Sequence, residues 1–147
     1  MSSNIIKYPF DYDPVIEILL ENLHDPSKAP YRISALIDTG ATSTVIPYTV
    51  CEILGHSFEK GIASYTASGI GTSGIRTFVH ATRLTLLEPP QETEFFSFTK
   101  PVFEPIEFYL EFIEQDLPCV LLGQSDFLRL FRYTQDGKAG WFSLERI

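Results

Sequence analysis

Cysteine and positive charge are scarce in this sequence. It has two cysteines, Cys51 and Cys119, which lie far apart and form no C-x-x-C pair. Neither a disulfide framework nor an oxidising compartment is indicated. Eleven Lys and Arg stand against 19 Asp and Glu, for a formal net charge of −8. Because such a surface repels phosphate backbones and anionic lipid, we expect neither nucleic acid nor a membrane as a partner.

Long apolar runs are missing as well. The longest, residues 15–20, contains Glu17 and is far shorter than the roughly 20 residues that span a bilayer. The N-terminus has no basic segment followed by an apolar core, as a secretory signal would have. We therefore expect a soluble, cytoplasmic protein.

Aromatic residues are abundant instead. They make up 14% of the chain, with 12 Phe and 7 Tyr, and there are ten prolines. Aromatic and β-branched residues fit a pleated, half-buried surface, whereas proline interrupts long helices. A chain of 147 residues fits one domain and can bury a core without a disulfide or a metal. We predict a single, mostly β domain over residues 1–147.

Strand-like segments follow one another along the chain, and alternating or β-branched residues mark them. They are residues 15–21, 32–38, 63–68, 75–87, 106–113, 120–122, 131–134 and 141–144, the last two forming a hairpin. Alternation in residues 106–113 places Glu107 and Glu111 on a solvated strand face.

Two short helices are predicted between these strands. Pro47 suits the first turn and Gly55 the C-terminal cap of a helix over residues 47–54. Residues 125–130 are expected to form one or two further turns, which Asp126 would begin or cap.

The strongest local signal is Ala35-Leu-Ile-Asp-Thr-Gly-Ala41, an apolar strand that ends in an acid, a hydroxyl and a glycine. Asp38 stands where the strand opens into a tight turn, so its carboxylate can face a cleft. Gly40 permits the turn, and the hydroxyl of Thr39 can bond nearby backbone. A plain aspartate between strand and turn would show the same pattern.

A later segment, Pro118-Cys-Val-Leu-Leu-Gly-Gln-Ser-Asp-Phe-Leu128, places a second apolar strand before Gly123. Together the two segments resemble the retropepsin-like aspartic proteases, and most closely the stand-alone bacterial type related to the retroviral enzymes. The resemblance implies an all-β, closed barrel-like half-fold of the acid-protease type with one or two short helices. It also implies a homodimer.

The same resemblance implies roles for individual residues. Asp38 would be the catalytic acid in an active-site loop completed by Thr39, Gly40 and Ala41. Leu122 and Gly123 would support that loop from the neighbouring strand. A glycine-rich flap would cover the substrate, and its predicted residues are Gly69, Ile70, Gly71 and Thr72.

The sequence departs from the retroviral pattern at two places. Retroviral members have Gly-Arg-Asn or Gly-Arg-Asp after the apolar pair, whereas this chain has Gly123-Gln124-Ser125-Asp126. An insertion over residues 88–105 also lengthens the spacing from Asp38. Ala41 follows the triplet as in retroviral members, which implies a weakly acidic to near-neutral working pH.

The chemistry requires two carboxyls that share one proton and one water. Of the seven aspartates only Asp38 is followed by Thr-Gly, so a second copy of the chain must supply the partner. We expect an aspartic endopeptidase that acts on polypeptides with no cofactor or metal. Two alternatives stay open: a catalytically silent dimer of the same fold that binds peptides or proteins, and a small β-barrel that binds a ligand.

Other motifs are weaker. Residues 69–74 fit G-x-G-x-x-G, but a strand follows them where dinucleotide binding needs a helix. The three histidines, His24, His56 and His80, share no metal-ligand spacing with one another or with the cysteines. Both cysteines are expected to be packed thiols.

Overall fold

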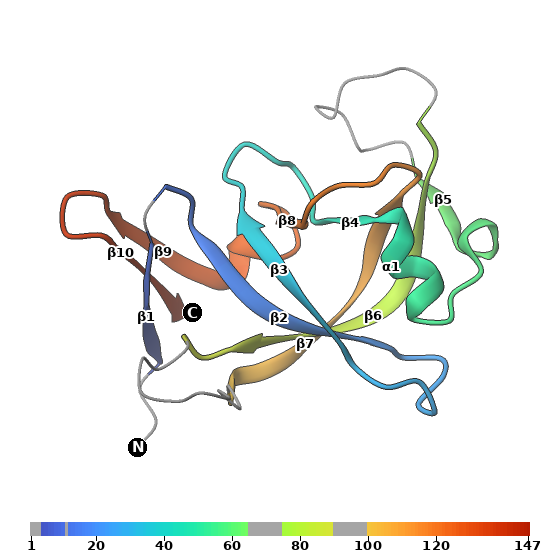
Figure 1. Ribbon diagram of the computed structural model, residues 1–147, viewed down its shortest axis with the longest axis horizontal. Coiled ribbons are helices and arrows are strands. Elements are labelled where there is room, and N and C mark those ends of the chain that lie inside the picture. Colours follow the sequence, from blue (N-terminus) through green and yellow to red (C-terminus); the bar gives the residue numbers. More distant parts are fainter. Residues whose placement is uncertain (1–3, 11, 65–74, 90–99) are drawn as a thin grey trace.

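The computed structural model describes residues 4–10, 12–64, 75–89 and 100–147. Strands dominate it (Figure 1). In chain order they are β1 Ile5–Pro9, β2 Val15–Asn22, β3 Tyr31–Ile37, β4 Val45–Pro47, β5 Ile62–Ser64, β6 Thr77–Leu87, β7 Pro101–Ile113, β8 Val120–Leu122, β9 Phe131–Asp136 and β10 Trp141–Arg146. The helical elements are α1 Tyr48–Ile53 and two 3₁₀ turns, η1 Phe58–Lys60 and η2 Leu128–Leu130.

Six strands close into a barrel. The larger sheet has the order β2-β3-β8-β4-β7-β6-β5, and an additional pairing of β2 with β6 closes it. Most neighbours are antiparallel, but β8 runs parallel to β3, and β4 runs parallel to β7. The predicted all-β, closed-barrel class is therefore confirmed.

A second, three-stranded sheet of order β1-β10-β9 lies beside the barrel and contains the C-terminal strand pair (Figure 1). The hairpin β9–β10 was predicted, whereas β1 was not. Strand β1 lies at an edge of this sheet, where Ile5 and Pro9 are exposed. Of its five residues only Tyr8 is fully buried, so β1 shows no clear alternation of apolar and polar residues in the sequence. The hydroxyl of Tyr8 donates a 2.9 Å hydrogen bond to the carbonyl of Leu87, which ties β1 to the barrel.

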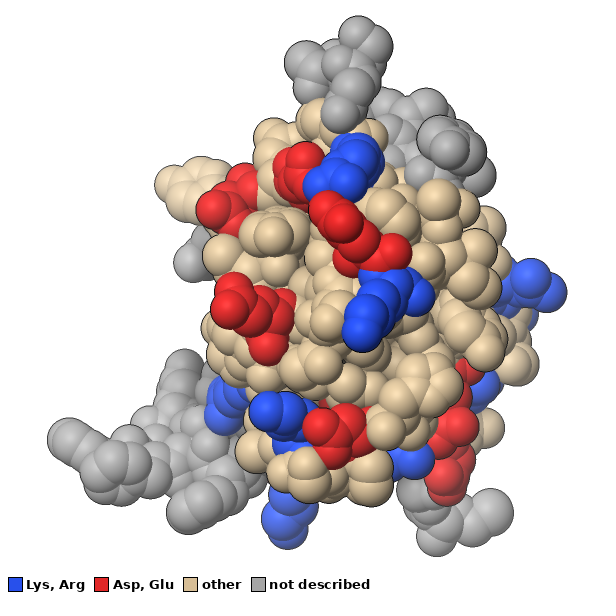
Figure 2. Space-filling view, turned by 90° about the vertical axis from the view of Figure 1, so that its right-hand side faces the viewer, with Lys and Arg blue, Asp and Glu red and all other residues tan. Residues whose placement is uncertain are grey.

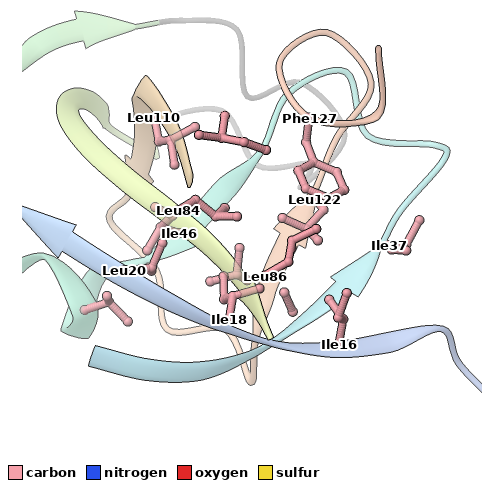
Figure 3. Close-up of a cluster of buried hydrophobic side chains, with 14 of the residues drawn as sticks. Ile16, Ile18, Leu20, Ile37, Ile46, Leu84, Leu86, Leu110, Leu122 and Phe127 are labelled. Carbon is pink, nitrogen blue, oxygen red and sulfur yellow. The ribbon is translucent and has the colours of Figure 1, made fainter. Parts of the chain in front are cut away.

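The barrel interior is apolar because alternate residues of each strand point inward. In β2 these residues are Ile16, Ile18 and Leu20, all buried, and they meet side chains from the opposite strands (Figure 3). Each such side chain stabilises the fold by roughly 1.5–3 kcal/mol relative to leaving it exposed. The core residues labelled in Figure 3 from the other elements are Ile37, Ile46, Leu84, Leu86, Leu110, Leu122 and Phe127.

Strand β7 corrects two predictions. It begins at Pro101 and runs for 13 residues, because its first part pairs with the end of β6 across a register shift between Leu84 and Leu86. The prediction that Glu111 lies on a solvated face is wrong, since its side chain is only 6% exposed. Strand β7 is paired on both sides at this point, with Val79 of β6 and Val45 of β4. Glu107 is exposed as expected.

The predicted helix is confirmed as α1, with Leu54 at its C-cap and Gly55 next at a φ of 80°. The helical turn near residue 128 is also present, as η2. In the described ranges no helix has the length and apolar character needed to cross a membrane.

Charges on the surface are mixed rather than gathered by sign. On the face drawn in Figure 2, basic side chains lie close to acidic ones. Most of the ion pairs join neighbouring strands, and their partners keep substantial contact with water. They are Arg32–Glu17, Arg83–Glu21, Arg83–Glu107, Arg132–Glu145 and the contacts of Arg76 with Glu59 and Glu114.

Candidate active site

Asp38 follows directly after β3 at one end of the barrel. Its backbone N–H donates a 3.0 Å hydrogen bond to the carbonyl of Leu122 in β8. The parallel register pairs Ile37 with Leu122, so the two strands end side by side. Both strand ends are apolar and buried, whereas the Asp38 side chain is partly exposed. The fold thus presents a carboxyl group at the barrel's surface on a rigid base.

The turn after Asp38 is closed by its own residues. The N–H of Gly40 donates to Oδ1 of Asp38 over 3.0 Å, and the N–H of Ala41 donates to the Asp38 carbonyl over 3.1 Å. Thr39 and Gly40 are exposed, and Ala41 is partly buried. The four predicted loop residues therefore form one tight turn around the carboxylate.

Gly123 lies where two backbones nearly touch. A Cβ atom at this position would be 2.3 Å from the carbonyl carbon and oxygen of Ser43. Only glycine allows this approach. Because Ser43 belongs to the chain between Asp38 and β4, the end of β8 packs directly against the active-site loop.

Gln124 was not predicted as part of the site, yet it contacts the loop twice. Its Nε2 donates to the Thr39 carbonyl over 2.8 Å, and its N–H donates to the Ala41 carbonyl over 2.9 Å. This residue stands where retroviral members have arginine. The only available signal was its place directly after Gly123.

Asp126 does not cap η2, since the N-cap residue of that turn is Phe127 and no side chain caps it. Its carboxylate instead reaches Thr44, whose N–H and hydroxyl both donate to it. Tertiary contact between the residue before β4 and the segment after β8 therefore takes precedence over the local capping that the sequence favoured.

A row of apolar side chains lies on the outer face of the barrel beside Asp38. The registers place Leu36 of β3 next to Leu121 of β8, and Leu121 next to Val45 of β4. Leu36 and Leu121 are only partly buried. Val45 is buried, so Leu36 and Leu121 supply the apolar surface at the same end of the strands as the carboxyl group.

The predicted flap residues Gly69, Ile70, Gly71 and Thr72 lie outside the described residues. The strands on either side are described, and β5 pairs antiparallel with the start of β6, with Ser64 opposite Thr77. Strands β5 and β6 are therefore antiparallel neighbours.

The structure brings two histidines together that the sequence spacing left apart. The rings of His56 and His80 stack with centroids 4.5 Å apart, and a ring nitrogen of His80 lies 3.0 Å from the Phe58 carbonyl. Burial lowers the pKa of His56 to about 4, with a smaller contribution from His80. Burial also lowers the pKa of His80, although the Phe58 carbonyl opposes that shift.

Both thiols are packed rather than activated. Cys51 is buried in α1, and burial raises its pKa to about 11. Burial likewise raises the pKa of Cys119. Cys51 and His56 line a small pocket of about 230 Å³ together with Tyr48, Glu52 and Phe58. Across the described part of the chain, no group of three or more potential ligands is placed to hold a metal ion.

Comparison with known proteins agrees with this architecture. The chain is similar to a solved structure described as a retropepsin-like aspartic protease from Rickettsia conorii, with a TM-score of 0.52 and 17% sequence identity. The match covers 97% of this chain and 90% of that chain. No protein-family model and no curated protein matches the sequence. The protein thus has the retropepsin-like fold, and at this identity the likeness speaks for the fold alone.

Proposed function

We propose that the protein is an aspartic endopeptidase whose catalytic pair is formed by Asp38 of two identical subunits. The observation that carries this proposal is the placement of Asp38. It stands at the end of a buried strand, in a Thr-Gly turn, hydrogen-bonded to the parallel strand β8. In this proposal the whole chain, residues 1–147, acts as one peptidase domain.

The proposed reaction uses the pair as acid and base. One carboxylate takes a proton from a water molecule, while the other carboxyl, protonated, donates a hydrogen bond to the scissile carbonyl. The water oxygen bonds to the carbonyl carbon to give a tetrahedral intermediate. The carboxyl that took the water proton then gives it to the leaving nitrogen, and the C–N bond breaks to release the amine and the new carboxylic acid. Because two adjacent carboxyls cannot both ionise easily, the pair titrates as a unit with two separated pKa values.

The substrate would be an extended polypeptide. Such a peptide can bind as an added strand, with alternate side chains entering pockets. Leu36 and Leu121, beside Asp38 on the outer face, would contact one of these side chains. The predicted flap residues 69–72 would cover the peptide and exclude water.

Replacement of one carboxyl tests this function. An unfolded protein substrate is incubated between about pH 4 and pH 7 with the wild type, with Asp38→Asn and with Asp116→Asn. Asp116 is exposed in the turn after β7, so its variant is a matched control. We expect cleavage to fall by roughly 10³-fold or more in Asp38→Asn only. Equal cleavage in wild type and Asp38→Asn would refute the proposal. No cleavage in any of them would favour the silent interaction module.

A mixing experiment tests the shared site. Asp38→Asn subunits are added in increasing amounts to a fixed amount of wild type, with exchange between the two allowed. If each site needs both carboxyls, mixed dimers are inactive, and excess variant removes almost all activity. Activity that stays constant during the titration would contradict a site built from two subunits.

A further inference from the structure

The carboxylate of Asp126 joins the segment after β8 to the loop that carries Asp38. The N–H of Thr44 lies 3.1 Å from Oδ1 and 3.0 Å from Oδ2 of Asp126, and the Thr44 hydroxyl donates to Oδ1 over 2.7 Å. These residues are 82 positions apart in the chain. Both oxygens of the carboxylate are therefore engaged by one residue, which directly precedes β4.

The Thr44 hydroxyl extends this link to β8. It accepts a 3.1 Å hydrogen bond from the N–H of Gly123 while it donates to Asp126. Thr44 is completely buried. A buried hydroxyl with one donor and one acceptor partner has a fixed orientation. Asp126, Thr44 and Gly123 thus form a continuous hydrogen-bonded path, which we call the Asp126 clasp.

The Asp126 clasp closes one end of the loop, and neighbouring residues hold the rest. The N–H groups of Gln124 and Ser125 donate to the carbonyls of Ala41 and Thr42. At the start of the loop, the N–H of Asp38 donates to the carbonyl of Leu122. Residues 122–126 therefore hold the active-site loop along its whole length, while the Asp126 side chain holds its far end.

The base of the clasp is rigid. Phe127, the next residue, is buried in the same core cluster as Leu122 (Figure 3). The N–H of Leu128 also donates to the Gly123 carbonyl over 2.9 Å. Asp126 is thus held on a fixed support.

The negative charge matters for this geometry. An ionised carboxylate offers only acceptors, which suits the two donors of Thr44. An asparagine would keep one acceptor and place an NH₂ group near the N–H of Thr44, so two donors would face each other. Hydrogen bonds from neutral donors to a carboxylate are also stronger than those to an amide.

We propose that Asp126 is a positioning residue for Asp38, because its hydrogen bonds to Thr44 set the loop geometry that two subunits need to bring their carboxyls together. This inference rests on the proposed peptidase function. Asp126 does not act on the substrate itself. It keeps the reacting group in place, and a misplacement of about 1 Å can cost about 100-fold in rate.

The test compares Asp126→Asn, Thr44→Val and Thr44→Ser with wild type and with the control Asp116→Asn. Steady-state kinetics gives kcat and KM, and hydrogen–deuterium exchange reports on the backbone of residues 38–44. Circular dichroism and thermal melting establish that each variant is folded. The exchange measurement needs no turnover, so it tests whether the Asp126 clasp holds residues 38–44 even if the protein cleaves nothing.

We expect Asp126→Asn and Thr44→Val to lower kcat by about 10- to 100-fold with little change in KM, and to speed exchange in residues 38–44. Thr44→Ser, which retains the hydroxyl, should recover most of the rate lost in Thr44→Val. A double variant that combines Asp126→Asn with Thr44→Val should lose little more kcat than either single variant, because both substitutions break the same link.

Unchanged kcat or unchanged exchange in folded Asp126→Asn would overturn the positioning role. Equal loss in Thr44→Ser and Thr44→Val would overturn it as well, since packing rather than the hydroxyl would then matter. A wild type without activity would refute the proposed function. Faster loop exchange in Asp126→Asn would in that case still support the structural link.

Discussion

The Asp38 loop and the His56–His80 pair differ in the exposure and hydrogen bonding of their titratable side chains. At the loop, backbone N–H groups and the Asp126 carboxylate hold the main chain, and the Asp38 side chain remains partly exposed. At the histidine pair, the rings are packed against each other and against Phe112. Among the described residues, the buried Nε2 of His56 has no hydrogen-bond partner. The first region leaves a titratable group available for chemistry, and the second keeps its groups neutral.

The two regions differ in what places their titratable side chains. His56 and His80 are brought together by burial, which lowers both pKa values and favours the neutral imidazoles. Asp38 instead stands at a strand end, where its side chain is partly exposed. Both regions contain a glycine at a close backbone approach, so matched substitutions can separate them.

Gly123→Ala should have the largest effect on stability. The added Cβ would lie 2.3 Å from the backbone of Ser43, which cannot move without displacing the active-site loop. We expect the free energy of unfolding to fall by about 3 kcal/mol, measured by urea denaturation. Gly137→Ala is the control, because a Cβ there meets nothing within 4 Å. A similar stability for both variants would show that the two backbones are not locked together.

Gly61→Ala probes the histidine region in the same way. Its Cβ would lie 2.6 Å from the Val79 carbonyl oxygen and 2.7 Å from Nε2 of His80. The His80 ring can shift but the Val79 backbone cannot, and both contacts are longer than the 2.3 Å approach at Gly123, so the expected loss of unfolding free energy is about 2 kcal/mol. Cleavage per folded molecule should stay at the wild-type level, unlike in Gly123→Ala. A specific loss of kcat would link the histidine region to the active site.

His56→Asn should change how stability depends on pH. The native pKa of His56 is lowered from 6.5 to about 4, so its neutral form is favoured by folding. Above the unfolded pKa this preference contributes fully. As the pH falls from 6.5 towards 4, the unfolded chain takes up a proton that the native state does not, and stability is lost. Because partial exposure to solvent weakens the effect, the free energy of unfolding of the wild type should fall by about 1 kcal/mol more than that of His56→Asn over this range.

Thermal melting at about pH 7 and about pH 4.5 measures this difference. The carboxylates titrate in both proteins, so their contribution cancels in the comparison. Identical pH profiles for the two proteins would show that His56 titrates normally in the native state.

Arg76→Gln should have the smallest effect. Arg76 forms ion pairs with Glu59 and Glu114, but its side chain is half exposed. Exposed pairs typically contribute less than about 1 kcal/mol and are screened by salt. We expect a slight loss of unfolding free energy that vanishes at about 1 M NaCl. A large loss that persists in salt would mean that contacts of Arg76 with Phe58 and Phe78 dominate instead.

Local patterns in the sequence were sufficient to predict many of the strands and the helix α1. The alternation in β2 and β3, the proline and glycine around α1, and the turn residues of the last hairpin act within a few residues, so the sequence alone predicts these elements. The Asp-Thr-Gly turn is local in the same sense. Its two loop hydrogen bonds join residues no more than three positions apart.

Only the tertiary structure decided how distant segments meet. The burial of Glu111 follows from pairing on both sides of β7, and the stacking of His56 on His80 from packing between a loop and β6. The link from Asp126 to Thr44 spans 82 positions, and that from Gln124 to Thr39 spans 85. No periodicity encodes such contacts, because their free energy depends on which surfaces the closed barrel brings together and not on neighbours in the chain.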